Sequence, residues 1–140
     1  MRHIDEIVAD FELLDDWEDR YRYLIELGRE LPAMPEADQN DRTKVPGCVS
    51  QVWLTSRRDD AAPPRVFFAG QSDAHIVKGL VAIALSLYSG RPANEILDLD
   101  ADAVFARLGL QDHLTPQRSN GLRSMVRRIR ADAESALQPA

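Results

Sequence analysis

Apolar residues recur at helical spacing near the start of the chain and predict two helices. The first covers residues 4–14 and places these side chains on one face: Ile4, Ile7, Val8, Phe11 and Leu14. Asp16 can cap a second helix, which ends at Leu31-Pro32. Its apolar stripe is Trp17, Tyr21, Leu24, Gly28 and Leu31. Residues 33–44 are polar and contain Pro35, which predicts a loop.

β-branched and aromatic residues then predict an antiparallel pair of strands. The first strand covers residues 49–56 and the second covers residues 65–69. The connector 57–64 is polar, ends in two prolines and is too short for a parallel crossover. A third short strand could precede Cys48, but the pattern does not define it. Residues 70–73 are predicted to form a turn, with Asp73 capping a helix that begins near Ala74.

The second half of the chain is predicted to be helical. Residues 74–88 are apolar nearly all round, which is typical of a buried core helix. A short segment runs from Pro92 to Leu97, and Asp100 caps a helix that stops at Gly109. Thr115 and Pro116 begin the last helix. Gly121 lies inside that helix, where it costs about 0.5–1 kcal/mol relative to alanine, so we expect a group packed close to its backbone.

The predicted fold is an α/β (α+β) domain, with a small antiparallel sheet packed against several helices in one unit, 1–140. Composition agrees, since 44% of the 140 residues are hydrophobic and 29% charged. No apolar run reaches the roughly 20 residues that span a bilayer, and no signal-peptide core follows Met1. We expect a cytoplasmic protein without a membrane partner. The net charge of −6 argues against a nucleic-acid partner.

Charge is distributed unevenly. Residues 1–41 contain 13 acids and 4 Lys+Arg, a balance of −9, whereas five arginines gather in the last helix: Arg118, Arg123, Arg127, Arg128 and Arg130. Two solvated faces would explain this pattern, and so would a polarity that orients a protein partner.

The candidate chemistry centres on Cys48, the only cysteine. Pro46 and Gly47 form a turn signal just before it, so its sulfur is predicted to lie on a loop anchored at one end by the sheet. Such loops often carry function. A buried cysteine that packs as a small hydrophobe is the alternative.

The chain lacks residues that several functions of a single cysteine would require. A nucleophilic hydrolase would need a histidine base, and His3, His75 and His113 show no local signature for one. Disulfide oxidoreductase chemistry needs a second cysteine, and a metal site needs more ligands. A thiol that receives a group from one protein and passes it on remains. Its pKa is ordinarily about 8.5, and Lys44 or Arg118 would raise the thiolate fraction if near.

The chain resembles the SufE/CsdE family of sulfur acceptors. The central motif is Gly47-Cys48-Val49-Ser50-Gln51-Val52-Trp53. Further blocks follow in the family's order and span nearly the whole chain: Trp17-Glu18, Ile25-Glu26-Leu27-Gly28, Ser72-Asp73-Ala74, Ile76-Val77-Lys78-Gly79-Leu80, His113-Leu114-Thr115-Pro116 and Arg118-Ser119.

The resemblance implies a function and a fold. Proteins of this family take sulfur from the persulfide of a PLP-dependent cysteine desulfurase (SufS or CsdA type), stimulate that enzyme, and pass the sulfur to a SufBCD-type scaffold. Cys48 falls on the acceptor cysteine, and the implied fold is shared with IscU-type scaffolds. The chain itself would need no cofactor, because PLP belongs to the desulfurase. It would act as a persulfide carrier and activator rather than as an enzyme.

The same view assigns supporting residues. Gly47, Ser50 and Gln51 belong to the cysteine loop, and His113 to a later motif. Arg118 is expected to hold the loop or steady the persulfide, unless it is only a surface arginine. Asp73 either caps the core helix or contacts the desulfurase. We expect Cys48 to tip into a mostly apolar pocket at rest and its loop to move on binding. A cysteine hydrolase and a non-catalytic binding module remain the competing functions.

Overall fold

The chain begins with two helices whose starts are fixed by capping side chains. The structure is a computed structural model that describes residues 2–48 and 50–138. Helix α1 spans Ile4–Leu13 and helix α2 spans Trp17–Arg29, close to the predicted bounds. The Asp16 carboxylate accepts the Glu18 N–H at 3.0 Å, which confirms the predicted cap. A short 3₁₀ turn, η1 (Glu36–Asp38), lies in the predicted loop.

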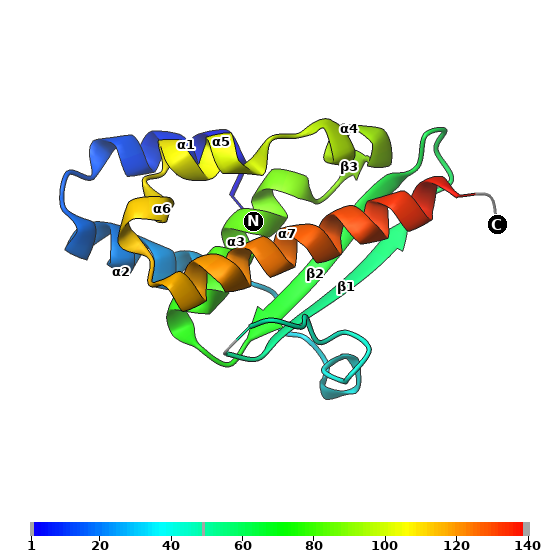
Figure 1. The fold of residues 1–140 in the computed structure, drawn as a ribbon, viewed down its shortest axis with the longest axis horizontal. Coiled ribbons are helices and arrows are strands. Elements are labelled where there is room, and N and C mark those ends of the chain that lie inside the picture. The colour runs from blue at the N-terminus through cyan, green and yellow to red at the C-terminus, as the bar shows by residue number, and fades with distance from the viewer. Residues whose placement is uncertain (1, 49, 139–140) are drawn as a thin grey trace.

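The described residues form a three-stranded sheet in the order β1-β2-β3, built from β1 (Val52–Arg58), β2 (Arg65–Ser72) and β3 (Arg91–Pro92). Strands β1 and β2 pair antiparallel, with Val52 opposite Ser72 and Arg58 opposite Val66, so the predicted hairpin is confirmed. Val66 and Leu54 are buried on the same face. That face lies against α3 (His75–Tyr88) and α7 (Pro116–Leu137), as Figure 1 shows.

Two details of the predicted hairpin are wrong. β1 was expected from residue 49, and Val49 lies outside the described residues, but Ser50 and Gln51 precede the strand rather than belonging to it. β2 does not turn at Gly70. It continues to Ser72 because residues 70–72 pair with residues 52–54 of β1. Pairing with a neighbouring strand therefore overrides the local turn signal.

Asp73 does not cap the core helix. The N-cap residue of α3 is Ala74, whose side chain cannot accept a hydrogen bond. The Asp73 carboxylate instead accepts the Gln51 N–H at 3.0 Å. The predicted cap is wrong because this acceptor is engaged by the segment that follows Cys48.

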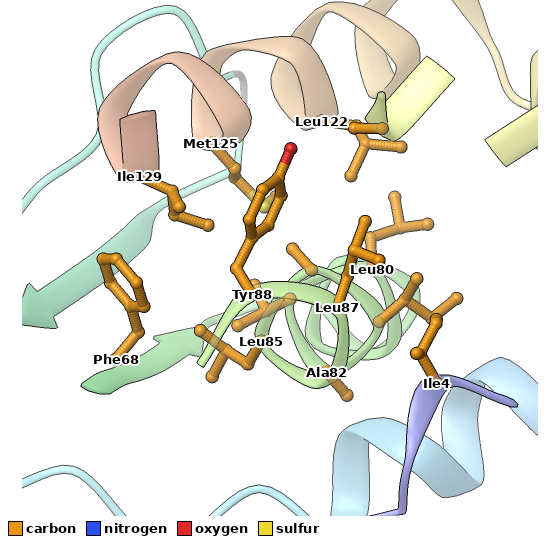
Figure 2. Close-up of a cluster of buried hydrophobic side chains, with 14 of the residues drawn as sticks. Ile4, Phe68, Leu80, Ala82, Leu85, Leu87, Tyr88, Leu122, Met125 and Ile129 are labelled. Carbon is orange, nitrogen blue, oxygen red and sulfur yellow. The ribbon is translucent and has the colours of Figure 1, made fainter. Parts of the chain in front are cut away.

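Helix α3 forms the centre of the core, as its pattern predicts. Val81, Ile83 and Tyr88 are completely buried. Figure 2 shows Tyr88 pointing from α3 toward Met125 of α7, while Ile4 of α1 approaches another side of the helix. Neighbours on several sides explain why α3 has no polar face.

The remaining helices follow the sequence signals with one addition. α4 (Ala93–Asp98) and α5 (Ala101–Arg107) match the predicted segments, and Asp100 caps α5 through the Ala103 N–H at 3.2 Å. A four-residue helix, α6 (Leu110–His113), was not predicted. Thr115 caps α7 through the Arg118 N–H at 3.2 Å. The predicted fold of a small antiparallel sheet packed against helices is confirmed, and no helix in the described residues is long and apolar enough to cross a membrane.

Candidate functional site

Cys48 lies between two short paired segments that form a hairpin, which we call the Cys48 hairpin (residues 43–48 and 50–54). Lys44 and Trp53 make an antiparallel bridge. The Val45 N–H donates to the Val52 carbonyl and the Leu54 N–H donates to the Thr43 carbonyl, both at 2.8 Å. The short paired segment that the sequence only hinted at before Cys48 is therefore present. Cys48 occupies the connection between the two arms.

Gly47 shapes the turn just before Cys48. Its φ is +86°, a conformation that glycine adopts at little cost and other residues rarely adopt. A Cβ at this position would lie 2.7 Å from the Ser124 hydroxyl oxygen of α7, so the turn also rests directly on that helix. Gly47 is thus required both by backbone conformation and by space.

The other side of the loop is held by the end of β2. The Gln51 N–H donates to the Asp73 carboxylate at 3.0 Å, and the Ser72 hydroxyl donates to the Gln51 carbonyl at 2.7 Å. The Asp73 N–H also donates to that carbonyl at 3.3 Å. Asp73 and Ser72 therefore fix the backbone three residues after Cys48.

The sulfur of Cys48 lies against α7. Its thiol is 3.7 Å from the Gly121 carbonyl, within reach of a weak S–H···O hydrogen bond. A Cβ on Gly121 would lie 3.6 Å from Sγ, an ordinary van der Waals distance. The group expected to pack against the Gly121 backbone is therefore Cys48 itself.

A cavity of about 210 Å³ opens beside this thiol. Apolar side chains from α3 and α7 contribute to its wall: Val77, Leu80 and Met125. Polar residues complete it: Ser50, Thr115, Gln117 and Arg118. Cys48 is half-buried, so the expectation that it tips into a pocket is met, although the lining is more mixed than predicted.

Burial raises the pKa of the Cys48 thiol above its ordinary value. The thiol in this conformation therefore gives up its proton less readily than an exposed thiol does. This shift is opposite in sign to the one predicted from Lys44 and Arg118.

The structure gathers most of the sequence-predicted site residues but not all of them. Ser50 and Arg118 line the cavity with Cys48, while Gln51 and Asp73 lie behind the loop. Arg118 is exposed. His113 lies elsewhere: its ring stacks on Trp17 with centroids 3.9 Å apart, and its carbonyl accepts the Tyr21 hydroxyl at 2.6 Å.

Sequence reasoning missed Ser124, Gln117 and Val77 as parts of the site. Ser124 is 5% exposed and lies three residues after Gly121, on the same side of α7. A small polar residue at a buried helical position, one turn from an interior glycine, was the available signal. Val77 carried no such signal, because its apolar character was assigned to the core.

The described residues around Cys48 lack the groups that a histidine-assisted hydrolase or a metal site would need. None of the three histidines, all of which lie in residues 2–48 and 50–138, lines the Cys48 cavity. Within the same residues no group of three His, Cys, Asp or Glu side chains is placed to hold a metal ion. The chemically distinctive group in the cavity is the thiol.

Known proteins resemble this chain along nearly its whole length. A family model described as "SufE: Fe-S metabolism associated domain" matches residues 5–133. An uncharacterised SufE-like protein of Rhizobium meliloti (strain 1021) is 55% identical over 138 residues, which cover 98% of this chain and 99% of the relative. An uncharacterised SufE-like protein of Rhizobium etli is 56% identical over 135 residues, 96% of this chain and 91% of the relative.

A solved structure supports the fold independently. The solution structure of a hypothetical protein from Thermus thermophilus superimposes with a TM-score of 0.76 over 96% of this chain and 95% of that one. The two sequences are 20% identical, so the likeness concerns the fold alone.

Proposed function

The chain belongs to the SufE family, whose domain is associated with Fe–S metabolism, and on that premise we propose that Cys48 accepts sulfur from a cysteine desulfurase persulfide. The chain then carries the sulfur as a Cys48 persulfide and passes it to a scaffold of the SufBCD type. It also stimulates the desulfurase by removing the sulfur. PLP acts in the desulfurase, and this chain contributes the thiol.

The observation that carries the proposal is the cavity beside Cys48. A terminal sulfur attached to Sγ needs room next to the thiol and shelter from water and from other thiols. The cavity of about 210 Å³ offers that room, and Val77, Leu80 and Met125 give it an apolar wall. A thiol packed only for stability would leave no such space beside it.

The transfer step follows ordinary sulfur displacement. Cys48 loses its proton, and the thiolate attacks the terminal sulfur of the donor's persulfide. A new S–S bond forms at Sγ as the donor's S–S bond breaks, and the donor sulfur leaves as a thiolate. The electron count is unchanged, so no added oxidant or reductant is needed. Burial raises the pKa of Cys48, so in the proposal the turn around Cys48 moves to a more exposed position, where the proton leaves more easily, while the two paired arms stay in place.

Arg118 supplies a cation at the cavity wall. In the proposal its guanidinium faces the persulfide anion or the donor once the turn around Cys48 has moved. Asp73 and Gln51 keep the arm behind the loop in place during that movement.

Two competing functions are less favoured. A cysteine hydrolase would place a histidine at the thiol, whereas His113 stacks on Trp17 and His3 accepts the Asp5 N–H at the start of α1. A pure binding module would not require a cavity beside the sulfur.

The test is intact-protein mass spectrometry after incubation with a SufS-type desulfurase and cysteine. Wild-type protein should gain the mass of one sulfur atom, and dithiothreitol should remove it. Cys48→Ser should gain nothing while keeping its fold. A wild-type protein that gains no sulfur, or a Cys48→Ser protein that gains as much, would refute the proposal.

A further inference from the structure

Three residues on one side of α7 contact the segment that carries Cys48, and we call them the α7 stripe: Gly121, Ser124 and Arg128. Their spacings of three and four residues place them along one face of the helix. Gly121 contacts the Cys48 thiol through its carbonyl, and Ser124 lies under Gly47. Arg128 reaches the residue before the hairpin. One helix face therefore meets the Cys48 segment at three successive points.

Ser124 is held rigidly at the middle of the stripe. Its hydroxyl donates to the Asn120 carbonyl at 3.0 Å and accepts from the Arg127 guanidinium at 3.0 Å. The side chain is buried, and a Cβ on Gly47 would come within 2.7 Å of its oxygen. Both hydrogen bonds orient the hydroxyl, so the Gly47 turn packs against a side chain with a defined position.

Arg128 holds the residue that immediately precedes the hairpin. Its guanidinium donates to the Arg42 carbonyl at 2.9 Å, immediately before Thr43. Asp132, one turn further along α7, accepts from the same guanidinium at 3.4 Å and orients it. Both side chains are about a quarter exposed, so water screens this pair less than it screens a surface pair.

We propose that Ser124 and Arg128 are positioning residues that hold the Cys48 hairpin against α7 and so control how readily its sulfur meets a reactant. Neither residue touches the reacting atoms. Ser124 acts through Gly47, and Arg128 acts through Arg42. The meaning for sulfur transfer rests on the proposed function, whereas the effect on thiol accessibility does not require it.

The test is the rate of Cys48 alkylation by iodoacetamide, measured across pH without any desulfurase. Arg128→Met should react about two- to tenfold faster than wild type at neutral pH, the change in hairpin opening expected from losing its one hydrogen bond to the Arg42 carbonyl. Ser124→Ala should also react faster, because it removes the oxygen on which the Gly47 turn rests. The pH midpoint of the reaction should fall toward that of an ordinary thiol, because the released sulfur is less buried. Arg128→Lys keeps a donor and should restore part of the wild-type rate.

Arg123→Met is the matched control, because Arg123 is exposed on another side of the same helix and should leave the rate unchanged. Wild-type rates and midpoints in both folded test variants would overturn the proposal, as would an equal rise in Arg123→Met. Sulfur loading by a desulfurase is then measured separately. A wild-type protein that gains no sulfur would refute the proposed function. It would not affect the result on how Ser124 and Arg128 control Cys48 alkylation.

Discussion

Glycine allows close approach in two regions of this molecule, with opposite results. Where α2 crosses α3, a Cβ on Gly79 would lie 2.2 Å from the Leu24 carbonyl oxygen, and one on Gly28 would lie 2.6 Å from the Lys78 Cβ. Where the Cys48 hairpin meets α7, a Cβ on Gly121 would lie 3.6 Å from Sγ. At the α2–α3 crossing, backbone atoms already occupy the space. At the hairpin, space remains beside the Cys48 sulfur.

We infer that the α2–α3 contact stabilises the fold, whereas the contact between the Cys48 hairpin and α7 leaves room for a reaction at Cys48. The α2–α3 crossing brings two helices to backbone contact and has no room for another atom. The hairpin contact lies beside a cavity of about 210 Å³ and is bounded by a few hydrogen bonds. We therefore expect changes at the crossing to act on folding, and changes at the hairpin to act mainly on Cys48.

Gly79→Ala should have the largest effect on stability. The new methyl would meet the Leu24 carbonyl, so α2 and α3 must separate. Overpacking of this kind costs about 2–3 kcal/mol or more, which exceeds the roughly 1 kcal/mol that alanine gains as a helix former. Urea denaturation measures the change. A free energy of unfolding equal to wild type would show that the crossing is looser than the structure indicates.

Gly47→Ala should have the next largest effect, about 1–2 kcal/mol, because its φ of +86° is unfavourable for alanine. The contact with the Ser124 oxygen adds to that cost. In the double variant with Ser124→Ala the steric part should disappear and the conformational part should remain. A double-mutant cycle on the free energy of unfolding measures this coupling. Strictly additive effects would contradict the contact.

Gly121→Ala should separate stability from function. Its methyl fits at 3.6 Å from Sγ without a clash, and alanine in a helix interior is worth about 0.5–1 kcal/mol over glycine. Unfolding should therefore require slightly more urea. Sulfur loading should nevertheless slow several-fold, because the methyl occupies space beside the thiol. Faster loading, or a destabilised protein, would break the comparison between the two glycine contacts.

The smallest effect concerns pH. Because burial raises the Cys48 pKa, the folded protein holds the thiol proton to higher pH than the unfolded chain does. The stabilisation from this group is therefore complete below the unfolded pKa of about 8.5 and is lost as pH rises through the folded value. Cys48→Ser should show a shallower decline in the free energy of unfolding above that pH. Identical declines would indicate that the thiol is not sheltered.

Several helices were predictable because a capping side chain marks the residue before each of them. Asp16, Asp100 and Thr115 cap helices where the sequence places them. The strands were less predictable, since β2 runs through Gly70 only because β1 lies opposite it. β3 has two residues and α6 has four, too few for any periodic pattern to appear.

The site was predictable at its centre and, through Ser50 and Arg118, along part of the cavity wall. Cys48 and Gly47 stand out in the sequence as a lone thiol behind a turn signal. Ser124 and Val77 come from elements distant in the sequence, and their place beside the hairpin depends on how α3 and α7 pack. Asp73 shows the same limit, because its acceptor role at Gln51 replaces the local capping role that its position suggested.

The most direct test locates the transferred sulfur in the chain. Protein loaded by a SufS-type desulfurase and cysteine is alkylated, digested with trypsin and sequenced by tandem mass spectrometry. The account predicts one extra sulfur atom between the Cys48 Sγ and the alkyl group, in the peptide covering residues 45–57. A Cys48 peptide that carries only the alkyl group, under conditions in which the desulfurase turns over, would contradict it.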